Sequence, residues 1–344
     1  MKVITNKVVC LLGFLILVHF THGQDLDLNK LLQPVSKQSV FRLDNYMVWC
    51  GSPIRGKDGK FYLFYSRWPR NLTHQAWATH SEIAVAVSNK ANGPYKHVKV
   101  VLPKREKKYW DADVTHNPNI HRFGNTYYLY YMGNYGNGEW WDHRNHQRIG
   151  VAISKNPLGP WKRFDKPIVD TSYKSFDHMI ASNPSVVKQP NGKYLMIYKG
   201  VSEGKLPFGG IVLHGAAISS NPVGPFIKQY QRIFVKDTVR FAAEDPYIWY
   251  QKGKYWAIVK DFKGSFTNSG LSLALFESPN GLDWKPGKNA LVSKTIIPFK
   301  SGDKLVEKLE RPQLLFVNGI PISLFCAVYD KGDNYNVAIP LKRD

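Results

Sequence analysis

The sequence predicts an all-β protein, and among all-β folds it predicts a five-bladed β-propeller. Aromatic residues make up 14% of the 344 residues, and such side chains suit pleated sheets. A pattern of an X-Pro pair, a strand, a turn and an aromatic strand recurs five times, about every 65 residues. This even spacing argues against a row of independent sandwiches and favours blades around one axis.

Each repeat is marked by a proline that we expect to open the innermost strand of a blade. A glycine-bearing turn follows, of the kind that joins antiparallel strands. An aromatic strand and a third strand come next, so each repeat supplies the three or four strands of a propeller blade. The five prolines are Pro53, Pro118, Pro184, Pro246 and Pro312.

We expect one propeller domain over residues 24–344. The fifth repeat runs out of chain after Pro340, so its outermost strand is predicted to come from the residues near 35–43. Closing the ring in this way would protect sheet edges that otherwise invite aggregation. The expected blades lie at about residues 44–110, 111–172, 173–238, 239–300 and 301–344.

The N-terminus resembles a secretory signal peptide over residues 1–23. Lys2 and Lys7 flank the start of an apolar run over residues 8–20, and the small Gly23 follows. The run is too short to span a bilayer, and no other run approaches that length, so we expect no membrane insertion. The predicted location is secreted or periplasmic.

Two cysteines, Cys50 and Cys326, remain beyond this segment. Two cysteines make neither a disulfide framework nor a zinc site. Buried free thiols are therefore predicted in preference to a disulfide between neighbouring blades.

The chain is strongly basic, with 47 Lys and Arg against 26 Asp and Glu and a formal net charge of +21. Such a charge favours an anionic partner, for example an acidic polysaccharide. A solvated basic surface that only aids solubility is the alternative. No nucleic-acid-binding motif is present, so we expect no nucleic-acid partner.

Polar residues precede the prolines in every repeat, where the inner strands of a propeller should face the central funnel. Apolar residues would be expected in a core, yet only Gly51 among these ten is neither polar nor charged. Such convergence predicts a binding or catalytic site, the alternative being a polar lining around a water-filled channel. The pairs are Gly51-Ser52, His116-Asn117, Ser182-Asn183, Glu244-Asp245 and Glu310-Arg311.

These motifs, each followed by its proline, resemble those of five-bladed glycoside hydrolases of the family 43 type and their secreted bacterial relatives. The resemblance covers roughly residues 40–342. It implies a proton-donating Glu at Glu244. It also implies a base in the first blade and a pKa-tuning Asp in the third, where this sequence has Ser52 and Asn183.

Glycoside cleavage needs a proton donor and usually a second carboxylate across the sugar. With Glu244 as the donor, each of the other candidates also has an ordinary structural interpretation as a capping residue or an ion-pair partner. Arg311 would either pair with Glu310 or bind a substrate carboxylate or sulfate. The candidates for the second carboxylate are Asp113, Asp44, Asp177 and Glu310.

Other side chains suit sugar recognition. Arg67, Lys199 and Lys260 follow the second strands of three blades and would form an anion-binding ring, unless they are solvated edge charges. The loop over residues 133–147 is expected to overhang the funnel. The remaining candidates are His116, Asn117, Asn183, Asp245 and His178 for polar contacts, and Trp49, Trp140 and Trp141 for stacking on a sugar face.

The sequence predicts no metal ligand set and no cofactor, although the resemblance allows a structural calcium ion near the axis. The preferred function is an exo-acting glycoside hydrolase on a plant or algal oligosaccharide or polysaccharide, possibly anionic. One alternative is a lyase on a uronic-acid glycan, using His116 and Arg311. Another is a non-catalytic carbohydrate-binding propeller, which the absence of carboxylates at Ser52 and Asn183 favours.

Overall fold

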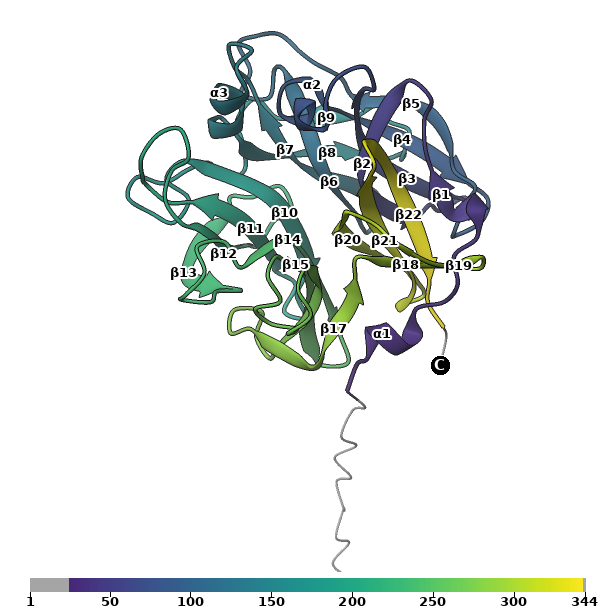
Figure 1. The fold of residues 1–344 in the computed structure, drawn as a ribbon. Helices are drawn as coiled ribbons and strands as arrows, with labels where there is room; N and C mark the ends of the chain where they lie inside the picture. The colour runs from purple at the N-terminus through teal and green to yellow at the C-terminus, as the bar shows by residue number, and fades with distance from the viewer. Residues whose placement is uncertain (1–24, 343–344) are drawn as a thin grey trace, which may run out of the picture.

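Five four-stranded antiparallel sheets surround one axis in the computed structural model, which describes residues 25–342 (Figure 1). The predicted all-β, five-bladed propeller is confirmed. The predicted signal peptide over residues 1–23 lies outside the described residues. Within residues 25–342 no helix is long and apolar enough to cross a membrane.

The first four blades are built from consecutive strands, and the innermost strand of each comes first in the chain. Blade one contains β2 (Tyr46–Arg55), β3 (Phe61–Pro69), β4 (Glu82–Ser88) and β5 (Lys96–Leu102). Blade two contains β6 (Val114–Phe123), β7 (Thr126–Asn134), β8 (Arg148–Ser154) and β9 (Lys162–Arg163). Blade three contains β10 (Ile180–Lys188), β11 (Tyr194–Val201), β12 (Val212–Ser219) and β13 (Ile227–Ile233). Blade four contains β14 (Ala243–Gln251), β15 (Lys254–Asp261), β16 (Ser272–Ser278) and β17 (Lys285–Lys294).

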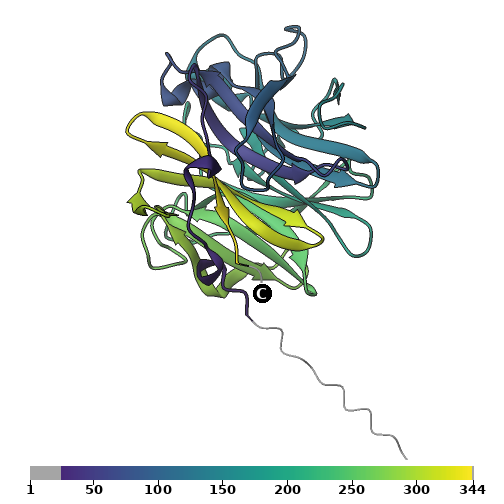
Figure 2. The same ribbon diagram turned by 90° about the vertical axis from the view of Figure 1, so that its right-hand side faces the viewer.

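The fifth blade joins the two ends of the chain. Its strands β20 (Lys308–Val317), β21 (Ile320–Asp330) and β22 (Asp333–Pro340) are completed by β1 (Val40–Phe41), which pairs antiparallel with β22. Figure 2 shows the purple N-terminal segment running alongside the yellow strands of this blade. The outer strand predicted near residues 35–43 is thereby confirmed.

Short helices and one hairpin lie in the segments that connect the strands of the blades. The hairpin of β18 (Ile296–Phe299) and β19 (Gly302–Leu305) lies between blades four and five. Helix α2 follows β3 and helix α3 follows β7, so both stand at the end of the propeller where the inner strands begin. The helical elements are α1 (Leu28–Leu31), η1 (Lys37–Ser39), η2 (His74–Ala76), α2 (Trp77–His80) and α3 (Trp140–Asn145).

The prediction that each proline opens its strand is wrong. The prolines of blades two to five lie inside the inner strands, at a β-bulge. In β6, His116 pairs with Met132 and Asn119 pairs with Tyr130, so Asn117 and Pro118 together oppose one residue of β7. A bulge accommodates proline because it interrupts the ladder of hydrogen bonds to which proline cannot donate.

The bulge in blade one lies two residues before the position that Pro53 suggests. Trp49 pairs with Ser66 and Ser52 with Phe64, so Cys50 and Gly51 form this bulge. Trp49 and Cys50 therefore occupy the positions that we assigned to Gly51 and Ser52. The first bulge residue of every inner strand has a left-handed φ between 53° and 57°: Cys50, Asn117, Asn183, Asp245 and Arg311.

Below the bulges, polar side chains tie neighbouring blades together. Three of them accept a backbone N–H of the next inner strand at 2.9–3.0 Å. Each bond satisfies a buried donor on the free edge of an inner strand, which has a neighbouring strand on one side only. The acceptor and donor residues are Ser52 with Ile120, Asn119 with Val186, and Ser185 with Ile248.

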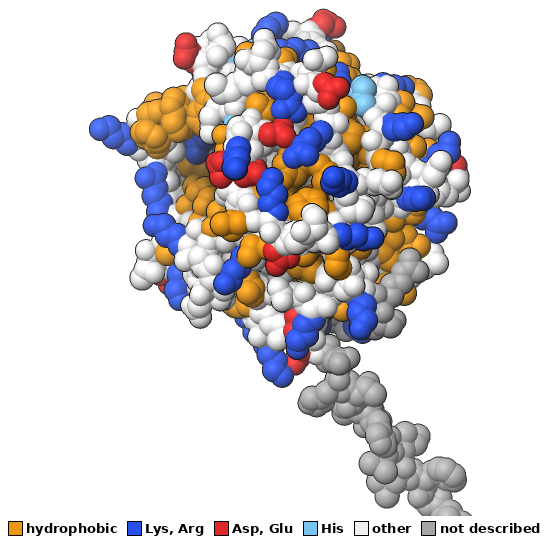
Figure 3. Space-filling model, turned by 45° about the vertical axis from the view of Figure 1, so that its right-hand side comes forward, with side chains coloured by type: hydrophobic (Ala, Val, Ile, Leu, Met, Phe, Trp, Pro, Cys, Tyr) orange, Lys and Arg blue, Asp and Glu red, His pale blue; other side chains and the backbone are white. Residues whose placement is uncertain are grey.

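Basic side chains are dispersed over the face drawn in Figure 3, among polar and apolar groups. On that face they do not gather into one patch. The net charge therefore does not by itself locate a binding site.

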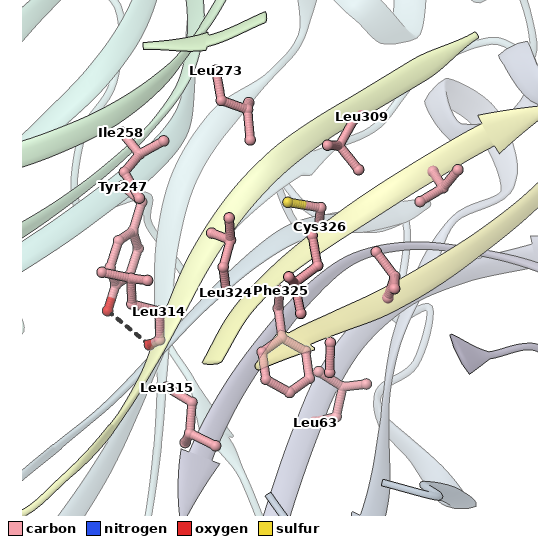
Figure 4. Packing of buried hydrophobic residues seen from close by; sticks show 14 of the residues in the cluster. Leu63, Tyr247, Ile258, Leu273, Leu309, Leu314, Leu315, Leu324, Phe325 and Cys326 are labelled. Atoms are coloured by element: carbon pink, nitrogen blue, oxygen red, sulfur yellow. Dashed lines mark hydrogen bonds between the residues drawn. The ribbon is translucent and has the colours of Figure 1, made fainter. Parts of the chain in front are cut away.

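Apolar packing between the blades holds the ring together. The largest cluster joins blades four, five and one, and includes Leu63, Leu324 and Phe325 (Figure 4). Tyr247 in β14 donates a hydrogen bond to the Leu314 carbonyl oxygen in β20 at 3.1 Å. Cys326 packs in the same cluster, and both it and Cys50 are free and buried, which confirms the predicted thiols.

Candidate active site

The side chains of the five left-handed bulge residues meet at the axis and are linked by hydrogen bonds. Cys50 Sγ donates to Asn117 Oδ1 at 2.8 Å, and Asn117 Nδ2 donates to Asn183 Oδ1 at 2.5 Å. Asn183 Nδ2 and a guanidinium nitrogen of Arg311 both donate to Asp245 Oδ1, at 2.7 and 2.8 Å. We call these five residues the axial ring.

Arg311 and Asp245 form a buried ion pair within this ring, their side chains being 3% and 5% exposed. Burial alone would lower the pKa of Arg311, but Asp245 outweighs burial and raises it. Burial raises the pKa of the Cys50 thiol, and the nearby Arg311 acts in the opposite direction. Arg311 Nε is buried without a hydrogen-bond partner among the described residues, so the guanidinium keeps a donor unused.

A pocket of about 280 Å³ lies above the axial ring, at the end where the inner strands begin. We call it the axial pocket. Ionisable and aromatic side chains dominate its wall, and the axial ring forms its floor. Its lining is Trp49, His74, Gln75, Trp77, His116, Asn117, Asn183, Lys199, Phe241, Glu244, Asp245, Lys260, Phe262, Lys308, Glu310 and Arg311.

Glu244 is held as a carboxylate by two lysines. Lys199 Nζ lies 2.6 Å from Glu244 Oε1, and Lys260 Nζ lies 3.8 Å from Oε2. Burial alone would raise the pKa of Glu244, but these two ammonium groups outweigh it and lower the pKa to about 2. The electrostatics of the pocket therefore do not support the predicted role of Glu244 as proton donor.

Glu310 shows the opposite behaviour. Lys260 Nζ lies 2.5 Å from Glu310 Oε1, and the side chain is only 9% exposed. Burial raises the pKa of Glu310; Asp245 and Glu244 act in the same direction, and Lys260 offsets them only in part. Two carboxyl groups that share Lys260 thus have pKa values shifted in opposite directions, which is how acid and base roles are divided in enzymes.

His116 is a buried neutral imidazole in the pocket wall. It stacks on Trp77 with ring centroids 5.2 Å apart, and its Nδ1 lies 2.7 Å from Ser81 Oγ. Burial lowers its pKa well below the usual value, and Arg311 adds to the effect. An uncharged His116 can exchange hydrogen bonds with a sugar hydroxyl but carries no charge for an anion.

Six pocket residues were not foreseen from the sequence. Lys308 stands two residues before Glu310 on β20, so the period of a strand could have placed both on one face. His74 and Trp77 belong to a loop and short helix that no repeat pattern marks. The six are His74, Gln75, Trp77, Phe241, Phe262 and Lys308.

His74 and Lys308 lie together at the pocket wall. Lys308 Nζ donates to His74 Nε2 at 3.4 Å, and no carboxylate pairs with Lys308 within the described part of the chain. Burial, and then the charge of Lys308, lower the pKa of His74 to about 4. Lys308 therefore presents an uncompensated positive charge to the pocket.

The predicted cationic ring is not formed. Lys199 and Lys260 pair with Ser182 and Glu244 across their sheets, whereas Arg67 pairs with Val48, one residue before Trp49. A shift of one residue turns a side chain to the other face of a strand. Arg67 accordingly binds Glu82 at 2.9 Å, outside the pocket.

The other acidic candidates lie outside the axial pocket. Asp113 accepts hydrogen bonds from Lys107 Nζ at 2.5 Å and from the Gly136 amide at 3.1 Å, so it organises the loop over residues 133–147. Asp177 accepts from the Tyr198 hydroxyl at 2.9 Å and pairs with Lys228. Asp44 is an exposed residue of the bend before β2.

His178, predicted to contact substrate, is likewise elsewhere. Its Nδ1 accepts from the Lys174 amide at 3.0 Å, and its ring contacts Tyr173. Trp49 does line the pocket, and it packs against His74. Trp140 reaches the pocket only indirectly, through an edge-to-face contact with Trp77 at 5.9 Å.

The axis does not fit a calcium ion. The positive charge there is supplied by Arg311, whose guanidinium hydrogen-bonds the Asp245 carboxylate. Within residues 25–342 no group of three or more His, Cys, Asp or Glu side chains is arranged to hold a metal. We derive no chemical step through a metal.

Neither a protein-family profile nor a curated protein sequence matches this chain. Solved structures do share its fold. BT0996, in a complex with RGII, has a TM-score of 0.69 at 14% identity, over 92% of this chain and 93% of that one. Zg3597, a family 117 glycoside hydrolase of the marine bacterium Zobellia galactanivorans, has a TM-score of 0.63 at 16% identity, over 90% and 89%.

The endo-arabinase of Bacteroides thetaiotaomicron has a TM-score of 0.60 at 13% identity, over 91% of this chain and 98% of that one. At such identities the likeness establishes a shared fold. The class defined by fold and site is therefore a five-bladed propeller, of the kind found in glycoside hydrolases, with an acidic and basic pocket at one end of its axis.

Proposed function

We propose that the protein is a glycoside hydrolase that removes a sugar from the end of an oligosaccharide. The observation that carries this proposal is the pair Glu244 and Glu310, which share Lys260 and have pKa values shifted in opposite directions. Glycoside cleavage uses such a pair of carboxyl groups. The shared fold of two proteins named as a glycoside hydrolase and an arabinase supports it.

The roles that we assign are the reverse of the sequence expectation for Glu244. Glu310, whose pKa is raised by burial, donates the proton to the leaving oxygen. Glu244, kept ionised by Lys199 and Lys260, acts as the base or nucleophile on the opposite side of the sugar. Asn117 and Asn183 in the pocket floor offer amide groups to hydroxyls.

The closed floor of the pocket supports attack on a chain end. The axial ring closes its floor, because Cys50, Asn117, Asn183, Asp245 and Arg311 are all buried and joined side to side. A polysaccharide cannot thread through such a floor, which favours binding of a terminal sugar. Exo action is therefore part of the proposal.

An anionic plant or algal glycan is the substrate that the charges favour. Lys308 faces the pocket without a carboxylate partner in the described residues, and the net charge is +21. One structural relative is named as an RGII complex. Export to the outside of the cell or to the periplasm, suggested by residues 1–23, completes the proposal.

Product analysis tests this function. The purified protein is incubated with arabinan, pectic, uronic-acid and sulfated oligosaccharides, and the products are separated and identified by mass spectrometry. We expect a saturated monosaccharide from the wild type and none from Glu310→Gln or Glu244→Gln. Glu277→Gln serves as the matched control, since Glu277 pairs with Lys254 and Lys285 outside the pocket.

The same experiment separates the alternatives. An unsaturated product would identify a lyase, for which the neutral His116 would be the base. Binding of an oligosaccharide without any release, in both wild type and variants, would identify a carbohydrate-binding propeller. Release that survives in Glu310→Gln would exclude the assigned proton donor.

A further inference from the structure

A second pocket of about 400 Å³ lies beside the axial pocket. We call it the side pocket. Insertions of three blades build it: α3 after β7, the loop between β11 and β12, and the segments before β14 and after β15. Its lining includes Trp141, Arg144, Phe208, Arg240, Phe241 and Lys263.

The two pockets adjoin each other and share one wall residue. Phe241 lines both of them. Burial lowers the pKa of Arg144, and the charge of Glu244 in the axial pocket acts in the opposite direction. The Arg144 guanidinium therefore lies near enough to the Glu244 carboxylate to interact with it electrostatically. The side pocket therefore lies within reach of a chain whose end enters the axial pocket.

An aromatic surface forms one wall of the side pocket. Trp141 and Phe208 make an edge-to-face contact with ring centroids 4.8 Å apart, and Phe208 is 56% exposed. Contiguous exposed apolar groups are a common mark of ligand-binding surfaces. Rings of this kind stack on the apolar faces of sugars.

Three cations complete the wall, and no carboxylate of the described residues lines it. Arg144 donates to the Asn145 amide oxygen, and Arg240 donates to the carbonyl oxygens of Gly209 and Gly210. Lys263 is exposed, and none of the three cations pairs with a carboxylate among residues 25–342. Their charge is left for a ligand.

We propose that the side pocket is a second sugar subsite, which binds the carboxylate or sulfate of a sugar adjoining the one in the axial pocket. The proposal rests on the function proposed above, because it takes the axial pocket as the site of the terminal sugar. Stacking on Trp141 and Phe208 orients the ring, and Arg144, Arg240 and Lys263 hold the anionic group. The substrate is thus an oligosaccharide with a charged residue next to its end.

Calorimetric titration of the full chain carrying Glu310→Gln tests this inference without turnover. The probes are tetragalacturonate, a sulfated carrageenan tetrasaccharide, neutral arabinotetraose and free galacturonate. We expect one of the two anionic tetrasaccharides to bind at least tenfold more tightly than arabinotetraose. The carboxylate and sulfate arms identify which anionic group is recognised.

Two variants locate the binding. Lys263→Gln and Trp141→Ala should each weaken binding of that tetrasaccharide about tenfold, as expected for one charge-assisted contact or one stacked ring. Lys263→Gln should leave the binding of neutral arabinotetraose unchanged, because that probe carries no anionic group. Free galacturonate measures how tightly a single charged sugar binds without its neighbour. Lys193→Gln is the control with the same change of charge, since Lys193 lies in the turn between β10 and β11, at the other end of the propeller.

Equal binding of neutral and anionic tetrasaccharides, unchanged by Lys263→Gln, would overturn the inference. Because Lys263 is exposed, that variant tests the subsite even if Trp141→Ala disturbs α3. Release of sugar from neutral chains alone would leave the glycosidase function standing and refute the anionic subsite. Anionic binding in the side pocket without any hydrolysis by the wild type would refute the glycosidase function instead.

Discussion

The two ends of the propeller axis are hollow, yet they differ in chemistry. The axial pocket measures about 280 Å³ and gathers Glu244, Asp245 and Glu310 among four cations. The cavity at the opposite end is larger, about 570 Å³, but no carboxylate of the described residues lines it. Arg55 and Arg122 are among the basic residues there.

The difference between these ends arises at the bulges of the inner strands. Above each bulge, side chains such as Glu244 and Glu310 face the axis and interact with one another through lysines. Below it, polar side chains accept hydrogen bonds from backbone N–H groups of the next inner strand, as do those of Ser52, Asn119 and Ser185. Volume therefore does not distinguish the end that carries the candidate active site; the cluster of ionisable side chains does.

The largest expected effect is on turnover. Glu310→Gln should reduce kcat by about 10²–10⁴-fold, the range expected when a general acid is removed. Arg122→Gln, in the opposite cavity, should leave kcat unchanged. Kinetics of the two variants on the substrate found by product analysis would measure this contrast, and a comparable loss in both would abolish the distinction between the two ends.

The next effect concerns stability. Asp245→Asn leaves the Arg311 guanidinium buried without its counter-ion, which should lower the free energy of unfolding by about 3–5 kcal/mol. Asp165→Asn is the matched control, because the Asp165 side chain is 78% exposed and lies 3.8 Å from Arg105. Such surface pairs contribute about 0–1 kcal/mol. Urea unfolding of both variants measures the difference, and equal losses would show that the axial ring does not depend on this pair.

A smaller effect is expected in acid. The folded-state pKa of Glu244 is lowered to about 2, below the value of about 4.3 for an unfolded chain. Its interactions therefore stabilise the protein above pH ~4.3 and are lost as the pH falls from there toward 2. Unfolding free energies measured between pH 7 and pH 2 should fall less steeply for Glu244→Gln than for wild type.

The control for the acid series comes from the other end of the axis. Arg122→Gln removes no carboxyl group and should keep the acid dependence of the wild type. The unfolding free energy of Glu244→Gln could instead fall with pH as steeply as that of the wild type. That result would mean that the pairing of Glu244 with Lys199 and Lys260 does not contribute to stability between pH 7 and pH 2.

The smallest effect is predicted for the opposite cavity itself. Arg55→Gln combined with Arg122→Gln should change the free energy of unfolding by no more than about 0.5 kcal/mol, as for most surface substitutions. Turnover should stay within about twofold, because no general acid or base is touched. A large loss of activity in this double variant, measured beside Glu310→Gln, would show that the opposite cavity contributes to catalysis and would contradict this prediction.

Local patterns in the sequence were sufficient for the architecture. The recurring prolines, turns and aromatic strands predicted five blades, because every blade repeats the same alternation of strand and turn. The shortage of chain after Pro340 predicted the N-terminal outer strand, which β1 provides. The polar residues before the prolines of blades two to five predicted the end of the axis at which the axial pocket lies.

Blade one shows why local patterns did not suffice for the site. Its proline stands two residues away from the bulge, so Ser52 was taken for the axial position that Cys50 occupies. Arg67 was misplaced by a single residue, which reverses its side of the sheet. The register of a strand depends on how it pairs with its neighbour. The sequence of a single strand therefore does not specify that register.

The repeat and the period of the sequence were enough to predict the number of blades, the closure of the ring and the end of the axis at which polar residues gather. The opposite pKa shifts of the two carboxyl groups, by contrast, follow from the tertiary structure. Glu244 and Glu310 occupy equivalent positions in their repeats, and a lysine of the preceding blade reaches each of them. Glu244 alone also has a lysine of its own blade nearby, Lys260, and Glu310 is the less exposed of the two. A pKa depends on the charges and the solvent that surround a group in space, and some of those neighbours come from other blades.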